Sequence, residues 1–248
     1  RRLPPRCGTE NMPHVEMKEC QHPLRIALSG YGRMGKEVEK AALAQGHVIT
    51  ARIDNEDDWK SAQGLEDAEV AIDFSVPETA PGNILRCFER RLPVVVGTTG
   101  WTDRLPEIKE RCLREKQALF VAANFSIGVH VFMAAARFLA QKAGAQGYRP
   151  RIEETHHIHK LDKPSGTALV LKRNILPFLA GTEDIAISSL REGETVGVHK
   201  LGFDSPTDGI ELIHTAKNRQ GLASGAVLAA QWLHGRTGFF GMEDLLGF

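Results

Sequence analysis

The chain has 248 residues, with 31 basic and 31 acidic side chains and a formal net charge of zero. Its apolar fraction of 42% and charged fraction of 25% are ordinary for a globular protein and exclude collagen-like, coiled-coil and extensively disordered chains. Electrical neutrality argues against generic nucleic-acid binding, which normally needs a basic surface. No apolar run approaches the roughly 18 residues of a membrane-spanning helix. We therefore expect neither nucleic acid nor a membrane as a partner.

The first 23 residues are rich in Pro, Arg and other polar side chains. They lack the apolar centre of a secretory signal, so we expect a disordered extension, or upstream sequence ahead of a start near Met12 or Met17. The chain has four cysteines: Cys7, Cys20, Cys87 and Cys112. They form no C-x-x-C pair, which favours buried or idle thiols over redox or metal chemistry and fits a reducing cytoplasm.

Short apolar runs and helical patterns alternate after Pro23. Five runs are expected to form strands, over residues 24–30, 47–54, 69–75, 92–100 (where the strand runs into a loop) and 118–124. Helices are expected over residues 33–45, from Pro77 to about Arg91, and, capped by Thr102 or Asp103, up to about Glu115. This alternation predicts an α/β domain of Rossmann type, with a parallel sheet covered by helices on both faces.

The second half has a different pattern. Helices are expected over residues 129–142, from Ser165 onward, and over residues 224–234, where the chain is expected to close. Strands are expected over residues 151–156, 184–191, 196–203 and 209–216. Turn residues separate the last three, which predicts antiparallel or mixed pairing. We expect a smaller α+β unit with a mixed sheet, beginning near Asn124.

A glycine-rich loop joins the first strand to the first helix. Gly30, Gly32 and Gly35 form the pattern G-x-G-x-x-G. The first glycine permits a tight turn, the second a close approach to a pyrophosphate, and the third close packing of helix on strand. Asp54, 19 positions after Gly35, ends the second strand, where a carboxylate can bind the ribose 2′-hydroxyl of NAD(H) and repel a 2′-phosphate. A dinucleotide site is predicted, although Arg52 complicates the preference for NAD(H).

Two further loops follow strands at the same expected edge of the sheet, over residues 97–100 (GTTG) and 123–126 (ANFS). Ligands of doubly wound sheets bind at this edge. Small, hydrogen-bonding side chains there suit a nicotinamide ribose and carboxamide, but equally suit ordinary strand-to-helix turns. The loops alone leave both interpretations open.

Side chains that can bind anions or transfer protons are most concentrated in the run EETHHIHKLDKPSGTALVL. Three histidines and two lysines fall within residues 156–163. Ser165 is expected to cap the helix that follows, leaving the N–H groups of Gly166 and Thr167 to bind an anion. Three interpretations compete: a metal site, a solvated loop before a capped helix, and an anion-binding catalytic loop. His156 and His157 point to opposite faces if they lie on a strand, which disfavours their joint binding of a metal.

This run closely resembles the signature of the dihydrodipicolinate reductase family, also called 4-hydroxy-tetrahydrodipicolinate reductases. The resemblance extends to GYGRMG, DFSVPE, VVGTTGW, AANFSIGV, REGETVGVH and GAVLAAQWL, and so covers almost everything after the first 23 residues. It implies a cytoplasmic homotetramer that uses NAD(P)H to form tetrahydrodipicolinate, a cyclic dicarboxylate of lysine and diaminopimelate biosynthesis. No metal is implied.

The resemblance also implies roles for individual residues and a division of the chain. His156 matches an acid/base histidine and Lys160 a proton donor. The matching substrate contacts are His157, Ser165, Gly166 and Thr167. The matching cofactor contacts are Gly30, Tyr31, Gly32, Arg33, Met34, Asp54, Phe74, Ser75, Gly97, Thr98, Thr99, Ala123, Asn124 and Phe125. A dinucleotide-binding domain is expected over residues 24–124 and 218–248, and a substrate-binding and oligomerisation domain over 125–217, after the extension 1–23.

The chain departs from the family pattern after the second strand. Asn55 follows Asp54, where the family often has an arginine that helps it accept NADPH. We therefore expect NADH to be preferred over NADPH. Two other classes of protein share the glycine loop: a different two-domain NAD(P)-dependent dehydrogenase, and a nucleotide-binding sensor without turnover. Neither would need the histidine–lysine run followed by Ser-Gly-Thr.

Overall fold

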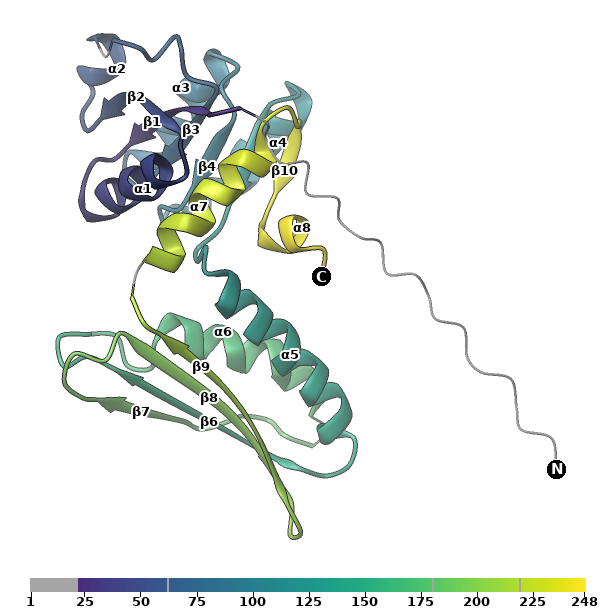
Figure 1. Ribbon diagram of the computed structural model, residues 1–248. Helices are drawn as coiled ribbons and strands as arrows, with labels where there is room; N and C mark the ends of the chain where they lie inside the picture. The colour runs from purple at the N-terminus through teal and green to yellow at the C-terminus, as the bar shows by residue number, and fades with distance from the viewer. Residues whose placement is uncertain (1–21, 62, 180, 219) are drawn as a thin grey trace.

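The computed structural model describes residues 22–61, 63–179, 181–218 and 220–248 (Figure 1). The expected N-terminal extension, with Cys7 and Cys20, lies outside these residues except for its last two. Within the described part of the chain, no helix is long and apolar enough to cross a membrane. The elements form two units, each built on its own sheet.

The first sheet has six strands, all parallel, in the order β10-β5-β4-β3-β1-β2. Its strands are β1 (Arg25–Ser29), β2 (Val48–Ile53), β3 (Val70–Asp73), β4 (Val94–Val96), β5 (Ala118–Val121) and β10 (Gly238–Phe240). The central strands β3 and β4 are wholly buried, because helices cover both faces of the sheet. This confirms the Rossmann-type prediction.

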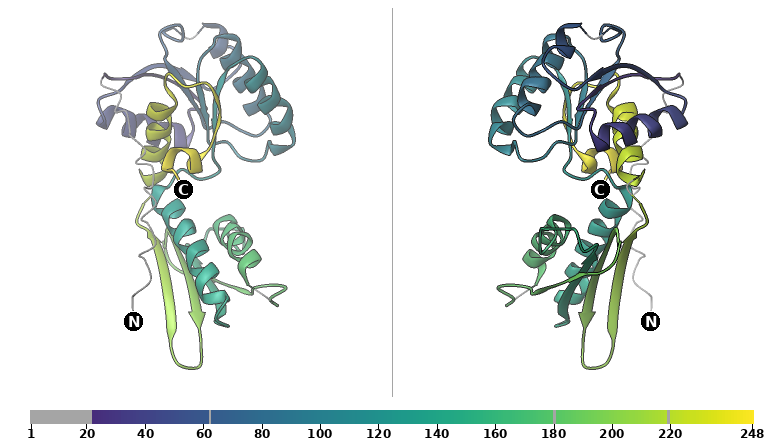
Figure 2. Two further views of the ribbon diagram at one scale, coloured as in Figure 1. Left: turned by 90° about the vertical axis from the view of Figure 1, so that its right-hand side faces the viewer. Right: turned by 90° about the vertical axis from the view of Figure 1, so that its left-hand side faces the viewer.

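Two hydrophobic cores separate these helices by face (Figure 2). One core contains side chains of α1 (Arg33–Ala44), α7 (Gln220–Leu233) and α8 (Met242–Leu246). The other contains side chains of α2 (Asp58–Ser61), α3 (Ala80–Glu89) and α4 (Leu105–Arg114). Cys87 and Cys112 are buried in the second core, and among the described residues they form no disulfide. Burial raises the pKa of the Cys112 thiol to about 11.

The second sheet has the order β7-β6-β8-β9. Its strands are β6 (Arg149–His156), β7 (Ile187–Arg191), β8 (Gly197–Asp204) and β9 (Gly209–Ala216). β6 pairs in parallel with β7 and antiparallel with β8, so the mixed sheet is confirmed. Helices α5 (Ile127–Gly144) and α6 (Gly166–Ile175) lie along one face (Figure 1) and share a core with it.

Two expectations about helices are wrong. Thr102 and Asp103 do not cap a helix. They lie in a short 3₁₀ helix, η1 (Thr102–Arg104), and α4 begins at Leu105 without a side-chain cap. A proline in its first turn needs no N–H partner, which makes a cap less necessary there. The chain also does not close with a helix near residue 234, because β10 and α8 follow and pack against the first sheet.

Candidate functional site

The glycine loop after β1 is fixed by close backbone packing. Gly30 has φ +83°, in the left-handed region, and a Cβ there would lie 2.3 Å from the Phe74 carbonyl oxygen. A Cβ at Gly35 would lie 2.2 Å from the Gly30 carbonyl oxygen. Gly32 differs, since no described residue other than Gly32 and its two chain neighbours has an atom within 4 Å of a Cβ placed there. The first and third glycines thus shape the loop, and the second leaves open space at the N-terminus of α1.

Asp54 lies beside this loop, at the end of β2. Its Oδ1 accepts a hydrogen bond of 2.9 Å from the Tyr31 backbone N–H. Arg52, two residues earlier, points to α1, where its guanidinium pairs with Glu39. The Glu39 carboxylate also accepts the Tyr31 hydroxyl, and its bond from Arg52 holds the Glu39 pKa below the usual range. Arg52 is therefore already paired with Glu39. Asp54 is the charged side chain at the end of β2 that lies beside the glycine loop.

A buried carboxylate that the sequence reasoning did not single out, Asp73, joins the loops at this edge. Its side chain is fully buried at the end of β3. Ser29 donates to it at 2.7 Å, Thr98 at 2.5 Å, Ser75 at 2.9 Å and Asn83 at 2.9 Å. Because these donors come from four segments, one anion holds the ends of β1, β3 and β4 and helix α3 together.

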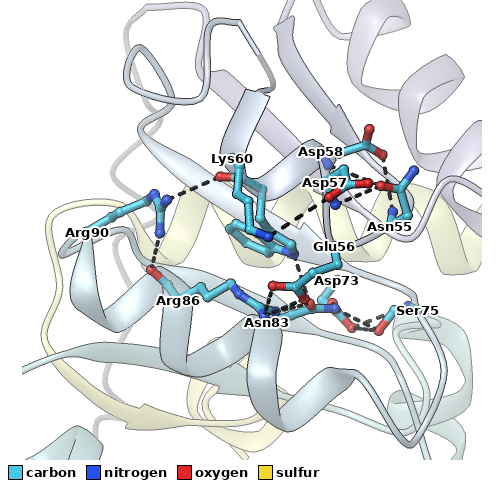
Figure 3. Close-up of polar contacts among 11 residues, drawn as sticks. Asn55, Glu56, Asp57, Asp58, Lys60, Asp73, Ser75, Asn83, Arg86 and Arg90 are labelled. Carbon is cyan, nitrogen blue, oxygen red and sulfur yellow. Dashed lines mark hydrogen bonds and ion pairs between the residues drawn. The ribbon is translucent and has the colours of Figure 1, made fainter.

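A smaller cavity of about 260 Å³ opens between the glycine loop and α3. Three predicted cofactor contacts line it: Gly30, Asp54 and Ser75. Trp59, Asn83 and Arg86 also line it, and no motif in the sequence marked them. Trp59 comes from α2, and Asn83 and Arg86, labelled in Figure 3, come from α3, so the fold brings both helices to the cavity that Gly30 also lines.

A larger cavity of about 1230 Å³ lies between the two units. Residues of the first unit, Thr99, Ala123 and Asn124, line it together with His156 and Lys160 of the second. The start of α6 contributes the predicted substrate contacts: Ser165, Gly166 and Thr167. The structure thus brings the predicted nicotinamide-side loops and the predicted catalytic residues to one space. Met242, Glu243 and Phe248 also border it, from the C-terminal segment whose strand and helix were not predicted.

His156 ends β6 with its side chain buried. Its Nδ1 contacts the Glu154 carboxylate, which is fully enclosed and also accepts a 2.9 Å bond from Arg191. Burial lowers the pKa of His156, and Glu154 partly offsets this. Burial alone would raise the pKa of Glu154, but its hydrogen-bonding partners, among them Arg191 and His156, bring it below the usual range. Glu154 therefore holds the imidazole as an ionised partner.

Arg191 also holds the loop that carries Lys160. It donates to the backbone carbonyls of Lys160 and Asp162 across the gap between β7 and the loop. The Lys160 ammonium lies 2.8 Å from the Asp162 carboxylate, whose pKa this contact lowers. A positive side chain that is partly shielded from solvent is thereby kept at the wall of the larger cavity.

Ser165 caps α6 as predicted, accepting a 3.2 Å bond from the Ala168 N–H. Its hydroxyl lies 3.1 Å from His199 Nε2, which places a β8 histidine against the same helix end. Burial is the main reason that the pKa of His199 falls to about 4, with the charge of His156 adding to the effect. His199 is therefore neutral near pH 7. The N-terminus of α6 and Lys160 then make the positive end of the cavity.

Several residues of the run lie elsewhere. His159 is exposed and 3.5 Å from Glu194. His157 and Lys163 are not among the residues that line either cavity. Phe125 is buried in the core against Phe74 and Phe120, so only its backbone is available to a ligand. The predicted cofactor contacts Tyr31, Gly32, Phe74, Gly97 and Thr98 lie outside the cavity linings in the loops at this edge, and Arg33 and Met34 begin α1.

Glu154, His156 and His199 offer ligand atoms within 4.8 Å of one another, a spacing that could hold a metal ion. The pair between Glu154 and Arg191 argues against a cation there, because the guanidinium already supplies the positive charge. The arrangement favours a hydrogen-bonded acid/base group over a metal centre.

Two family models match the chain. "Dihydrodipicolinate reductase, N-terminus" matches residues 24–125, and "Dihydrodipicolinate reductase, C-terminus" matches residues 128–246. The chain belongs to the dihydrodipicolinate reductase family. A curated relative from Christiangramia forsetii, named 4-hydroxy-tetrahydrodipicolinate reductase, is 42% identical over 90% of this chain and 98% of its own. One from Archaeoglobus fulgidus, with the same name, is 35% identical over 90% of this chain and all of its own. As a member of this family, the chain is an oxidoreductase.

A solved structure with the same fold is that of a dipicolinate-bound dihydrodipicolinate reductase from Paenisporosarcina sp. TG-14. It has a TM-score of 0.77 and 22% identity, and covers 90% of this chain and 99% of its own. At this identity, the likeness shows the two-unit fold of the family.

The residues of this chain fit the dinucleotide that the family implies. Gly32 leaves open space at the N-terminus of α1, which has no side-chain cap among the described residues, so its first N–H groups can donate hydrogen bonds to a pyrophosphate. The smaller cavity offers Asp54 beside it, and the larger one offers Thr99 and Asn124. NAD(P)H would thus lie along the carboxyl edge of the first sheet.

Proposed function

We propose that the chain reduces 4-hydroxy-tetrahydrodipicolinate to tetrahydrodipicolinate with NAD(P)H, in lysine and diaminopimelate biosynthesis. In balance, the substrate takes a hydride and a proton and loses one water. The observation that carries the proposal is the larger cavity, whose wall combines Thr99 and Asn124 with His156, Lys160 and the start of α6. The names of the curated relatives, and the dipicolinate bound to the solved neighbour, support the substrate class.

The substrate is a dianion, and the cavity wall offers groups that can hold it. The first N–H groups of α6 and the partial positive charge of its helix dipole can bind one carboxylate, beside Ser165, Gly166 and Thr167. The Lys160 ammonium adds hydrogen-bond donors and a positive charge close by, partly balanced by Asp162, which lines the same cavity. His157 is the remaining substrate contact that we infer from the family pattern, and it would need to turn toward the cavity from its place outside the lining.

Lys160 and His156 are proposed to handle protons. The nicotinamide, when bound, supplies the hydride. Reduction of a conjugated imine develops negative charge on the ring, and an ammonium held at the cavity wall can stabilise that charge and give up a proton. His156, fixed by Glu154, can pass a proton because its imidazole faces the same cavity.

NADH is proposed to be the preferred cofactor. Asp54, whose Oδ1 accepts the Tyr31 N–H, keeps acceptor capacity for the ribose 2′-hydroxyl at the position where a 2′-phosphate would be repelled, and Arg52 is paired with Glu39. Residues 24–124 and 218–248 are proposed as the dinucleotide-binding domain, and residues 125–217 as the substrate-binding domain. We propose further that this second domain assembles a cytoplasmic homotetramer through its sheet.

The experiment that tests the activity couples the chain to a synthase that produces 4-hydroxy-tetrahydrodipicolinate and follows the loss of NADH absorbance. Oxidation that depends on the synthase product is expected. Oxidation with other imino or keto acids alone would instead indicate a different two-domain dehydrogenase. Dinucleotide binding without oxidation of either cofactor would indicate a sensor.

A further inference from the structure

We propose that Glu56 determines the cofactor preference of this chain by holding Arg86, which would otherwise bind a 2′-phosphate. This inference rests on the proposed use of a dinucleotide. Glu56 and Arg86 are the residue pair that would discriminate between NADH and NADPH. Glu56 and Arg86 both line the smaller cavity, and Figure 3 draws their two side chains. The Arg86 Nη2 atom lies 2.6 Å from Glu56 Oε1 and also contacts the second carboxylate oxygen.

Trp59 and Asn83 also hold Arg86 in place. Its guanidinium lies over the Trp59 ring, 5.7 Å from the centroid, and its Nη1 is 3.5 Å from Asn83 Oδ1. Asn83 in turn accepts the Trp59 indole N–H at 3.0 Å and donates to Asp73 at 2.9 Å. The guanidinium therefore has a fixed position at the cavity, with 29% of the side chain exposed, while 58% of the Glu56 side chain is exposed.

The charges around the cavity show why the pair matters. Among the described residues that line it, Arg86 is the one cation, and the anions are Asp54, Glu56 and Glu78. A 2′-phosphate ester, like the phosphate of a phosphoserine, brings roughly 1.5 to 2 further negative charges. With Glu56 ionised, that phosphate would meet three carboxylates and a guanidinium that is already neutralised. An unmodified ribose brings no charge and can donate its 2′-hydroxyl to Asp54.

The sequence alone points to a different account, in which the cation needed for NADPH is missing because Asn55 follows Asp54. The structure supplies a cation from α3, 32 positions after Asp54, and pairs it with a carboxylate. The paired N–H donors of a guanidinium group bind a phosphate as well as they bind a carboxylate. Removal of the Glu56 charge would therefore leave Arg86 available to bind the 2′-phosphate.

The test is Glu56→Gln, which removes the charge and keeps the size. The dissociation constants of NADH and NADPH are measured by nicotinamide fluorescence, and those of ADP and 2′,5′-ADP by calorimetry. We expect the ratio of NADPH to NADH affinity to rise about 10- to 100-fold, as two charged contacts change from opposed to favourable. The ratio for 2′,5′-ADP over ADP should rise in parallel.

Glu78→Gln is the matched control, because it removes one carboxylate from the same cavity that is not bonded to Arg86. It should change the ratio much less than Glu56→Gln. The double variant Glu56→Gln with Arg86→Gln should return the ratio to the wild-type value or below. Glu56→Asp, which keeps the charge but shortens its reach, gives an intermediate shift and serves if Glu56→Gln does not fold.

Two results would overturn the inference: an unchanged ratio in both Glu56 variants, or equal shifts in Glu56→Gln and Glu78→Gln, which would leave net charge as the sole cause. Failure of the proposed function has another signature. The wild-type chain would then bind neither NADH nor NADPH, or would bind them without turnover in the coupled assay.

Discussion

Side chains from distant parts of the sequence fix His156 and Lys160. Glu154 is two positions from His156 on β6, where alternate side chains share one face of the sheet. Arg191 comes from β7 and joins Glu154 to the loop backbone at Lys160 and Asp162. One guanidinium therefore positions both the imidazole and the ammonium, and the geometry of the two groups depends on a residue that touches neither ring nor ammonium.

Replacing His156 or Lys160 with alanine should lower kcat by about 10²- to 10⁴-fold, the usual effect of a positioned acid or base. The coupled assay measures this at saturating NADH. His159→Ala is the matched control, since His159 belongs to the same run but is exposed beside Glu194. Near-wild-type turnover in both of the first two variants would refute the assigned roles.

Glu154→Gln should move the pH profile of kcat. Burial lowers the pKa of His156 and Glu154 partly restores it, so loss of the carboxylate lowers that pKa further. The inflection that belongs to His156 should therefore shift to lower pH, whether its protonated or its neutral form is active. Glu153→Gln is the control, because Glu153 lies on the other face of β6 and pairs with Arg151. An inflection at the wild-type pH would argue against Glu154 as a positioning residue.

At this scale the sequence could predict groups that are neighbours along the chain. His156, Lys160 and the Ser165 cap lie within one run. Local pattern was enough to predict the cap, and the resemblance of the run to a family signature assigned roles to His156 and Lys160. Trp59, Asn83, Arg86 and His199 could not be found in this way, because each becomes a neighbour only through strand pairing or helix placement. His159 and Lys163 show the converse, since closeness in sequence did not bring them to the cavity lining.

Among the elements, the ends of β1, β3 and β4 depend on the buried Asp73 carboxylate. Four donors converge on it, so its removal leaves polar groups without partners in a region closed to water.

Asp73→Ala should lower the free energy of unfolding by about 2–5 kcal/mol, because buried donors left unpaired cost roughly 1–3 kcal/mol each and the loops can relax only in part. Urea denaturation followed by circular dichroism measures this. Asp103→Ala, in the exposed 3₁₀ helix η1, is the comparison and should change stability little. Similar stabilities for the two variants would show that the Asp73 network contributes little to the fold.

The periodicity of apolar residues and the length of each helix or strand explain which elements could be predicted from the sequence. The strands of both sheets and the long helices carry clear apolar patterns, and most were predicted within a few residues. β10 has three residues and α8 has five, too few for a pattern to emerge. Their positions come from tertiary contacts, the pairing of β10 with β5 and the packing of Met242 and Leu245 in the core.

For the whole molecule, His199 links stability to pH. Its pKa in the folded chain is about 4, against an ordinary value of 6.5, so the unfolded chain binds one more proton between these values. The free energy of unfolding therefore falls as the pH drops from 6.5 toward 4, by on the order of 3 kcal/mol for this residue at most. His199→Gln should flatten the dependence in urea titrations over that range. His159→Gln, at an exposed site, should not.

Among the described residues, helices lie on one face of the second sheet only (Figure 1), and on the other face Leu190 and Ile213 are half exposed. If this face joins subunits, Ile213→Asp should dissociate the proposed tetramer, because an unpaired charge would be buried in the contact. Light scattering after gel filtration gives the mass. Ile210→Asp places the same charge on the other side of β9 and should leave the assembly intact. A monomeric wild-type chain would exclude the assembly outright.

The two cavities have no lining residue in common. Half-sized ligands, one adenosine-like and one nicotinamide-like, should therefore occupy the molecule together without displacing each other. Each alone would bind weakly, because it must give up its own freedom of motion for few contacts. Joined by a pyrophosphate, the second half meets its cavity at a high effective concentration, and the affinity of the whole far exceeds that of either part. The distance between the two separate cavities along one sheet edge thus determines how long a cofactor must be to occupy both at once.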